Sequence, residues 1–254
     1  MTTRPHDTGQ DTPGPGHPWG RPGPGRAGAG WPLLASMPAT ERRRLIALAR
    51  PRTFDRGDIV CHEGDPADSM HLVADGHFAV RVSLSSGDTA TVNHLGPGDY
   101  FGELALLRPD GRRTATVTAL DPARTLVLTE VAFRRLCEEH PAVHRALAVL
   151  LADRVDRLSH DVLELLHVGL DRRVYRHVHD LALDYRDTAT GAGDAGAGPV
   201  VVPLTQAQLA DLTGGTRPSV NQALQRLVRE GVVTLGRGRV EVHDLAALAR
   251  RCGR

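Results

Sequence analysis

The sequence lacks several features that would place it in a familiar class of protein. It has no lysine, so all 31 of its basic residues are arginine, which fits biased codon usage and points to no function. Its three cysteines, Cys61, Cys137 and Cys252, are far apart and form no CxxC pair. We therefore expect neither a zinc site nor a disulfide scaffold, and we place the chain in a reducing cytoplasm.

Long apolar runs are also missing. No run reaches the length of a membrane span, and the N-terminus lacks the apolar core of a signal peptide. No Ser/His/Asp set, metal-ligand cluster or Walker loop is visible, and the 13 histidines are dispersed. The sequence thus predicts no enzyme activity, no metal, no cofactor and no membrane partner. His71, His77 and His94 fall in strand-like runs, where we expect packing or surface roles.

The charge is distributed unevenly. The chain has a formal charge of +1, yet residues 204–254 contain eight arginines and four acidic residues, a net of +4. The rest of the chain is therefore slightly acidic. A basic C-terminal segment on an acidic body indicates an anionic partner for that end.

The first part of the chain divides into a tail and a β-rich domain. Residues 1–31 are rich in proline and glycine and predict a disordered tail. A short helix is expected from Thr40 as its N-cap. Between about 58 and 130, short apolar runs alternate with Gly-Asp pairs, which is typical of a compact antiparallel roll or barrel, although a sandwich would show the same pattern. We assign residues 32–140 to this domain.

A long helix follows, over residues 141–170. Its apolar residues Leu151, Val155, Leu158, Val162 and Leu165 are spaced 4-3-4-3, as in a coiled-coil seam. The helix could pack on its own domain, but so long a stripe favours pairing with a second copy of the chain. A hinge is expected near 168–170.

Residues 171–250 predict a winged helix-turn-helix. Thr205 and Gln208 fit a capping box, Gly214 and Gly215 break the helix, and Thr216 can cap the next one. Two β-like runs around 236–238 form the wing. In such a module the second helix enters the major groove of double-stranded DNA, although a winged helix can also serve protein contacts alone. The expected DNA-binding residues are Thr205, Gln206, Thr216, Arg217, Ser219, Asn221, Gln222, Arg226 and Arg237.

The stretch FGELALLRPDGRRTATVTA, residues 101–119, predicts a ligand site. Gly102 permits a tight turn, and a short helix from Glu103 to Leu106 would present free amides to an anion. Arg113 matches phosphate oxygens, and Thr114 adds a hydroxyl donor. Glu103 can accept from a ribose hydroxyl. The alternative is a Glu103–Arg113 ion pair that only holds a loop.

Both motifs resemble those of the cyclic AMP receptor protein and fumarate–nitrate reduction regulator family of bacterial transcription factors, over roughly residues 33–245. The resemblance implies an α+β fold: a jelly-roll-like, cyclic-nucleotide-binding β-roll, a long dimerisation helix and a C-terminal winged helix-turn-helix. It implies cyclic AMP as the effector, bound by the backbone of Gly102, Leu104 and Ala105 and by Glu103, Arg113 and Thr114. The residues that meet adenine would be Arg154, Leu158 and Ser159.

This sequence departs from the family pattern in ways that affect specificity. Leu158 replaces a threonine, so one hydroxyl near the base is missing and cyclic GMP becomes an alternative effector. Pro218 and Gln222 replace a base-reading Glu and Arg, so the operator should differ. The cysteine cluster of the iron–sulfur branch is absent. The leading hypothesis is a homodimeric, ligand-gated DNA-binding regulator with RNA polymerase as a candidate partner; the alternative is an orphan regulator whose roll is only a dimer scaffold.

Overall fold

The computed structural model of the chain describes residues 31–35, 37–108, 110–190 and 198–253. The tail expected over residues 1–31 thus lies outside the described residues, except for Trp31. The indole N–H of Trp31 donates to the carbonyl of Val73 (3.0 Å), so this residue belongs to the folded body rather than to a tail.

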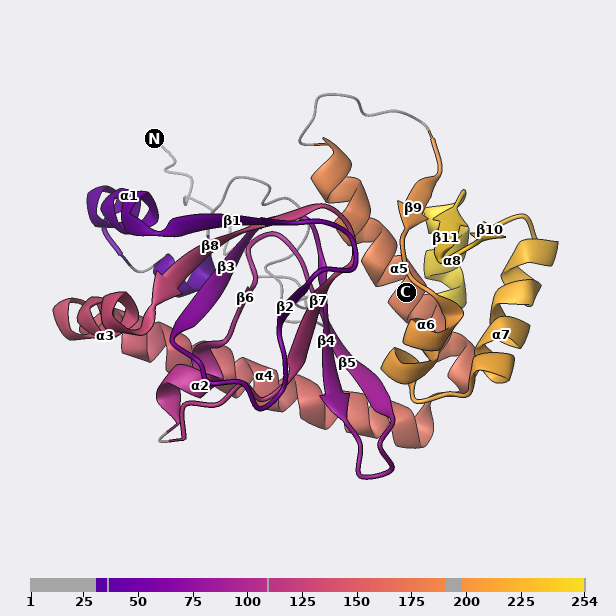
Figure 1. The fold of residues 1–254 in the computed structure, drawn as a ribbon. Coiled ribbons are helices and arrows are strands. Elements are labelled where there is room, and N and C mark those ends of the chain that lie inside the picture. The colour runs from indigo at the N-terminus through magenta and orange to yellow at the C-terminus, as the bar shows by residue number, and fades with distance from the viewer. Residues whose placement is uncertain (1–30, 36, 109, 191–197, 254) are drawn as a thin grey trace, which may run out of the picture.

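The N-terminal domain consists of two four-stranded sheets with antiparallel pairing. Their strand orders are β1-β8-β3-β6 and β2-β7-β4-β5. The strands are β1 (Arg50–Phe54), β2 (Ile59–Cys61), β3 (Ser69–Asp75), β4 (Phe78–Ser83), β5 (Thr89–Leu95), β6 (Tyr100–Phe101), β7 (Thr116–Ala119) and β8 (Ala123–Thr129). Figure 1 shows the two sheets curling into a roll. The sequence did not predict β1, whose first four residues are exposed, or β6, which has two residues.

Aromatic and β-branched side chains fill the space between the sheets. Phe54 and Phe78 meet edge to face at 5.7 Å, and Val80 and Val117 pack beside them. Each such buried side chain contributes about 1.5–3 kcal/mol to folding. His71 stacks on Phe101 at 4.7 Å, and burial followed by the nearby Arg113 charge lowers its pKa to about 3. It is therefore a neutral packing residue, as expected.

Short helices cover one end of the roll. They are η1 (Pro32–Leu34), α1 (Ala39–Leu48) and α3 (Glu130–Glu139). Helix α1 begins at Ala39 after Pro38 and has no side-chain cap, so the N-cap expected at Thr40 is wrong. The helical region after residue 130 is divided at His140 and Pro141, because the proline ring disfavours helical backbone in the residue before it.

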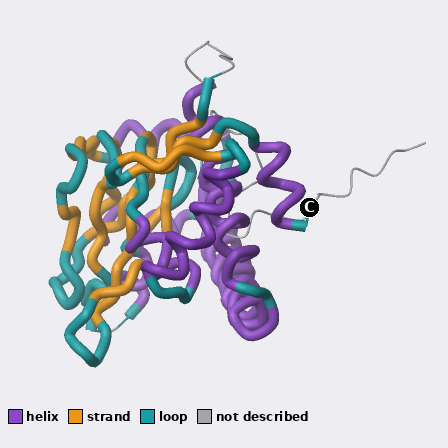
Figure 2. Tube along the Cα trace, turned by 90° about the vertical axis from the view of Figure 1, so that its right-hand side faces the viewer, coloured by secondary structure: helices purple, strands orange, loops and turns teal. Residues whose placement is uncertain are grey.

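Helix α4 (Pro141–His167) is the long helix that the sequence predicted. Its first half is anchored on the roll, where Val143 and Leu147 are buried against Leu33 and Leu34. Figure 2 looks nearly along its axis, with the strands to one side. Its second half bears exposed apolar residues: Val155, Leu158, Val162 and Leu165 are between 47% and 62% exposed. Helix α4 ends at His167, and the next helix begins at Leu170, which places a break where the hinge was expected.

The C-terminal module is a winged helix-turn-helix. It contains α5 (Leu170–Thr190), β9 (Val200–Val202), α6 (Gln206–Thr213), α7 (Arg217–Arg229), β10 (Val233–Gly236), β11 (Arg239–Val242) and α8 (Leu245–Cys252). Strand β9 was not predicted. It pairs with β11 and so forms a three-stranded sheet with the two wing strands, β10 and β11. The expected α+β fold, with a β-roll, a long helix and a winged helix-turn-helix, is confirmed.

The module packs against the β4–β5 face of the roll. Asp211 of α6 accepts the backbone N–H of Thr91 (3.1 Å). The ring of Tyr185 on α5 lies 3.8 Å from that of His77, and Ala79 belongs to the module's core. Strands β4 and β5 therefore connect the roll directly to the helix-turn-helix. Among the helices that are described, none is long and apolar enough to cross a membrane.

Candidate functional site

The turn before helix α2 (Glu103–Leu107) requires glycine. Gly102 caps this helix with φ of +90°, a left-handed conformation. A Cβ atom at Gly102 would lie 2.2 Å from Nη1 of Arg113 and 3.1 Å from the carbonyl oxygen of Ser69. The missing side chain thus lets the Arg113 guanidinium rest against the start of α2, whose first amides have no partner within the helix. Amides and guanidinium together form a cradle for an anion.

Replacing Gly102 by alanine should therefore displace Arg113 and remove anion binding. It should also destabilise the fold by about 1–3 kcal/mol, because the backbone is strained as well as crowded. Gly111→Ala is the matched control, since Gly111 has φ of +56° but nothing within 4 Å of its Cβ position. Thermal melts of both variants measure the loss of stability, and titration with ligand measures the loss of binding. Equal ligand binding by the two variants would contradict the crowding argument.

The six residues predicted for the phosphate and ribose line one cavity. It is lined by Gly102, Glu103, Leu104, Ala105, Arg113 and Thr114, together with Arg154 from α4. Glu103 is almost fully buried, and this burial raises the pKa of its carboxyl group, while the charges of Arg154 and then Arg113 oppose the rise. The ion pair that Glu103 forms is with Arg154, at 3.9 Å, so a Glu103–Arg113 bridge is not what holds this loop.

Arg113 is the most unusual group in the cavity. Its side chain is only 7% exposed, and its Nη2 donates to the hydroxyl of Ser69 at 3.3 Å. Its Nη1 is buried and has no hydrogen-bond partner within the described part of the chain. An unpaired buried cation is costly unless an anion completes its hydrogen bonds. The arrangement therefore suits a ligand that brings a negatively charged oxygen.

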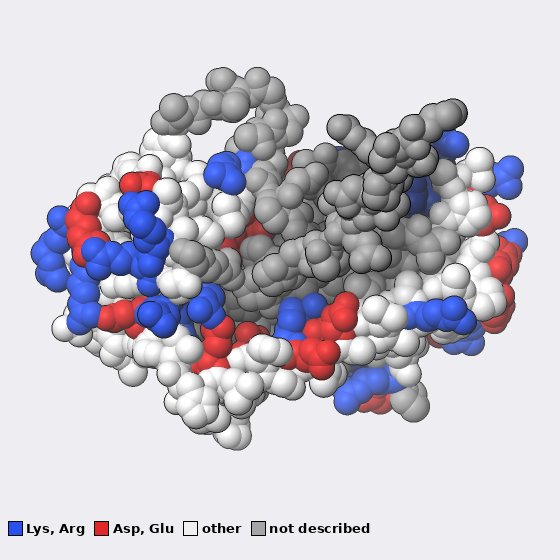
Figure 3. Space-filling view, turned by 180° about the vertical axis from the view of Figure 1, so that it is seen from behind, with Lys and Arg blue, Asp and Glu red and all other residues white. Residues whose placement is uncertain are grey.

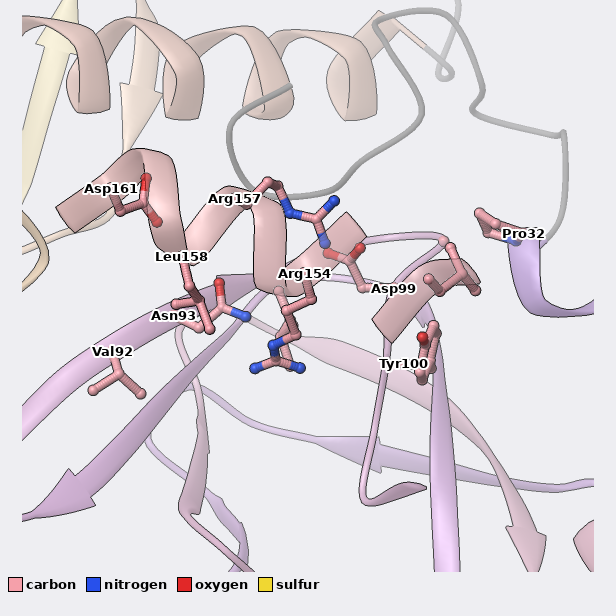
Figure 4. Close-up of a pocket in the computed structure, with 12 residues that line it drawn as sticks. Pro32, Val92, Asn93, Asp99, Tyr100, Arg154, Arg157, Leu158 and Asp161 are labelled. Atoms are coloured by element: carbon pink, nitrogen blue, oxygen red, sulfur yellow. The ribbon is translucent and has the colours of Figure 1, made fainter. Parts of the chain in front are cut away.

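The three helix residues predicted for the base lie at different distances from this cavity. Arg154 lines it, whereas Leu158 lines a neighbouring hollow, which Arg154 also lines. Figure 4 shows both on the face of α4 that is turned toward the roll. Ser159 is exposed and donates its hydroxyl to the carbonyl of Val155 in its own helix (3.0 Å). Within one chain, only Arg154 of the three reaches the cavity.

Sequence reasoning missed the cavity residues that other strands supply. They include the polar residues Asn93 on β5 and Tyr100 on β6. Sequence reasoning also missed Ser69 at the start of β3, which is a hydrogen-bond partner of Arg113. Neither Asn93 nor Ser69 is marked as functional by the sequence around it. Strand β5 also contains two threonines and a histidine, and only the folded pairing of distant strands places Ser69 beside Arg113.

The predicted DNA-reading helix has the expected construction. Thr205 and Gln208 form a complete capping box at α6, and Thr216 caps α7 by accepting the N–H of Ser219. On the inner face of α7, the side chains of Val220, Leu224 and Leu227 are buried. Arg217 and Gln222 are exposed at its N-terminal end. The helix thus directs polar side chains outward from the end that enters a major groove.

The other predicted DNA-binding residues are partly engaged within the module. Gln206 donates to Asn221 (3.1 Å), which ties α6 to α7, and Arg226 forms an ion pair with Asp171 of α5. Arg237 is exposed at the wing. Figure 3 shows arginine side chains gathered on the C-terminal module, at the left of that view. On this face of the module the arginines are interspersed with acidic side chains.

Comparison with known proteins gives two family matches. A cyclic nucleotide-binding domain matches residues 51–140, and a Crp-like helix-turn-helix domain matches residues 172–251. The chain is 30% identical over 207 residues to a CRP-like cAMP-activated global transcriptional regulator of Mycobacterium tuberculosis, covering 82% of this chain and 90% of that protein. It is 31% identical over 219 residues to the cyclic AMP receptor protein of Thermus thermophilus, covering 86% and 95%.

A solved structure shows the same architecture. A CRP-family transcriptional regulator from Thermus thermophilus superposes with a TM-score of 0.64 at 29% identity, over 80% of this chain and 97% of the other. The two matched domains and the fold therefore agree with the two sites described above.

Proposed function

Because the chain belongs to the CRP/FNR family of DNA-binding transcription regulators, we propose that it is a cyclic-nucleotide-responsive member of that family. The observation that carries the proposal is Arg113, a buried guanidinium whose Nη1 has no hydrogen-bond partner among the described residues, in a cavity shared with Glu103 and helix α2. The cyclic phosphate would complete the bonds of Arg113, and a ribose hydroxyl would donate to Glu103. The proposed setting is the cytoplasm, and no enzymatic step is assigned.

The signal would pass from the cavity to α4. Arg154 already joins the cavity to this helix through its ion pair with Glu103. A nucleotide that engages both residues changes the position of α4 relative to the roll, and the break after His167 can convert that change into a rotation of the DNA-binding module. The ligand drives the switch to the extent that it binds one arrangement more tightly than the other.

The proposed assembly is a homodimer formed through the exposed half of α4. An apolar stripe of this length costs free energy in water and is well suited to pairing with the same stripe of a second copy. Two copies would place two recognition helices on a duplex about one helical turn apart, roughly 34 Å. RNA polymerase would then be a further partner at the promoter.

Val155→Glu should convert this dimer into a monomer, because a two-fold interface would bury two unpaired carboxylates. Light scattering after gel filtration measures the change. Val131→Glu is the control, since Val131 is equally apolar and 77% exposed but lies on α3, outside the stripe. A monomeric wild-type protein, or a Val155→Glu variant that remains dimeric, would contradict the assignment.

The function itself is tested by titrating the full-length protein with cyclic AMP and cyclic GMP, and by measuring operator affinity with and without each nucleotide. The expected result is saturable binding of one nucleotide and a change in DNA affinity when it is present. DNA binding that is unaffected by either nucleotide would leave an effector-independent regulator.

A further inference from the structure

The cavity has a second end, beyond the groups assigned to the phosphate and ribose. A nucleotide held by Arg113 and Glu103 must place its base against the remaining wall. That wall consists of apolar residues, such as Val80 and Leu95, and of a few polar residues, Asn93, Tyr100 and Arg154. The chemistry of these polar residues determines which base fits, so the inference that follows rests on the proposed function.

Asn93 faces the cavity together with Leu95, two positions further along β5, as alternation in a strand requires. Val80 pairs with Asn93 and Arg81 with Thr91, so Val92 has no partner opposite it on β4. This bulge comes directly before Asn93, and Asn93 itself stays paired with Val80, which also lines the cavity. Asn93 lines both the cavity and the outer hollow, and it lies below α4 in Figure 4.

The orientation of the Asn93 amide is fixed by its own strand. Its Oδ1 accepts the backbone N–H of His94 at 2.8 Å. The opposite orientation would place two donors against each other, so Nδ2 with its two hydrogens must be the end that is presented to the cavity. An asparagine can bind adenine with its oxygen and nitrogen together. Here the oxygen already accepts the N–H of His94, so that mode would require its second lone pair to face the cavity as well.

The side chains nearest to Asn93 in the wall are mostly donors or apolar. Arg154 has donors alone, and Leu158, the α4 residue over the same hollow, is apolar. Burial raises the pKa of the Tyr100 hydroxyl, which therefore stays protonated and can either donate or accept one hydrogen bond. Two carboxylates, Asp99 and Asp161, line the outer hollow rather than the cavity, and both interact electrostatically with Arg157. Asp99 also accepts the N–H of Gly96 (2.8 Å).

Guanine and adenine present different hydrogen-bond donors and acceptors to these side chains. Guanine has two adjacent acceptors, O6 and N7, whereas adenine has the N7 acceptor beside an amino group that donates. Against Asn93 Nδ2 and the Arg154 guanidinium, the adenine amino group would face donors in a desolvated site. An unmatched pair of this kind is unfavourable. We propose that Asn93 determines base specificity and that, together with Arg154, it makes this site select cyclic GMP over cyclic AMP.

The experiment is a calorimetric titration of the full-length protein with cyclic GMP and cyclic AMP, in three forms: wild type, Asn93→Asp and Asn93→Leu. Asparagine and aspartate have the same shape, and the substitution keeps the oxygen that accepts from His94 while replacing the donating Nδ2 by an acceptor. Thermal melts verify that each variant folds. The ratio of the two affinities is the readout, because an added charge near the phosphate weakens both nucleotides together.

The wild type should bind cyclic GMP roughly tenfold or more tightly than cyclic AMP. Asn93→Asp should shift the ratio toward cyclic AMP by at least a similar factor, and Asn93→Leu should bring it close to one without reversing it. A wild-type preference for cyclic AMP, or a ratio that Asn93→Asp leaves unchanged, overturns the inference while the proposed function stands. If the wild type binds neither nucleotide, the proposed function fails and this inference fails with it.

Discussion

Replacing Arg113 by alanine should abolish measurable cyclic-nucleotide binding while the protein stays folded. Arg113 is the buried cation that faces the ligand cavity, and its Nη1 is without a partner in the described chain. Removing one member of a buried, hydrogen-bonded charge pair costs about 2–5 kcal/mol. That corresponds to a loss of affinity of roughly 30-fold to several thousand-fold. Titration of the variant with cyclic AMP and cyclic GMP, as for the wild type, measures this loss of affinity.

The unliganded Arg113→Ala protein should be as stable as the wild type or more stable. The substitution removes a buried charge that lacks a full set of partners, and such charges oppose folding. The backbone of residue 113 makes two hydrogen bonds that an alanine keeps. Its N–H donates to the carbonyl of Asp65, and its carbonyl accepts the N–H of Gly64. Arg112→Ala is the matched control, because Arg112 is the neighbouring arginine but is exposed and bonds only loop backbone at Gly64. Binding that survives in Arg113→Ala, or is lost equally in Arg112→Ala, would refute the pocket assignment.

Local motifs in the sequence were sufficient to predict the two functional regions. The string from Gly102 to Thr114 encodes a turn, a short helix and a returning arginine within thirteen consecutive positions, so the chain cannot separate them far. The capping box at Thr205 and the glycine pair before Thr216 likewise fix the ends of α6 and α7. In both regions the residues that determine geometry are close in sequence, and backbone sterics alone limit the outcome.

Features that depend on distant contacts could not be predicted in this way. Strand β1 is polar and exposed along most of its length, and it is a strand because β8 offers an edge to pair with. Strand β9 has three residues and depends on β11. Ser69 reaches Arg113, and Asn93 reaches the cavity, only through the pairing of strands far apart in the chain. Periodicity carries no information about such neighbours.

Replacing Arg217 by alanine should weaken binding to the specific operator and reduce the preference for it over unrelated DNA. Arg217 is the first residue of α7 and is exposed, and the Thr216 cap holds the backbone on which it stands. From there a guanidinium can donate two hydrogen bonds to O6 and N7 of a guanine, a pairing worth about 1–3 kcal/mol against the wrong base. Two copies on a two-fold operator would double the loss, to about 2–6 kcal/mol, because well-separated contacts add.

The control for Arg217→Ala must remove an equal charge from the same helix. Arg229→Ala does this, since Arg229 is exposed at the opposite end of α7. A lost phosphate contact weakens all sequences alike and lowers the salt dependence, whereas a lost base contact relaxes preference at one position of each half-site. Selection of binding sites from a randomised DNA pool, with both variants at the same salt concentration, separates these outcomes. If the Arg217→Ala variant selects the wild-type DNA sequence and only its overall affinity is reduced, Arg217 contacts the DNA phosphates and not a base. Base reading must then come from Gln222 or Asn221 on the same helix.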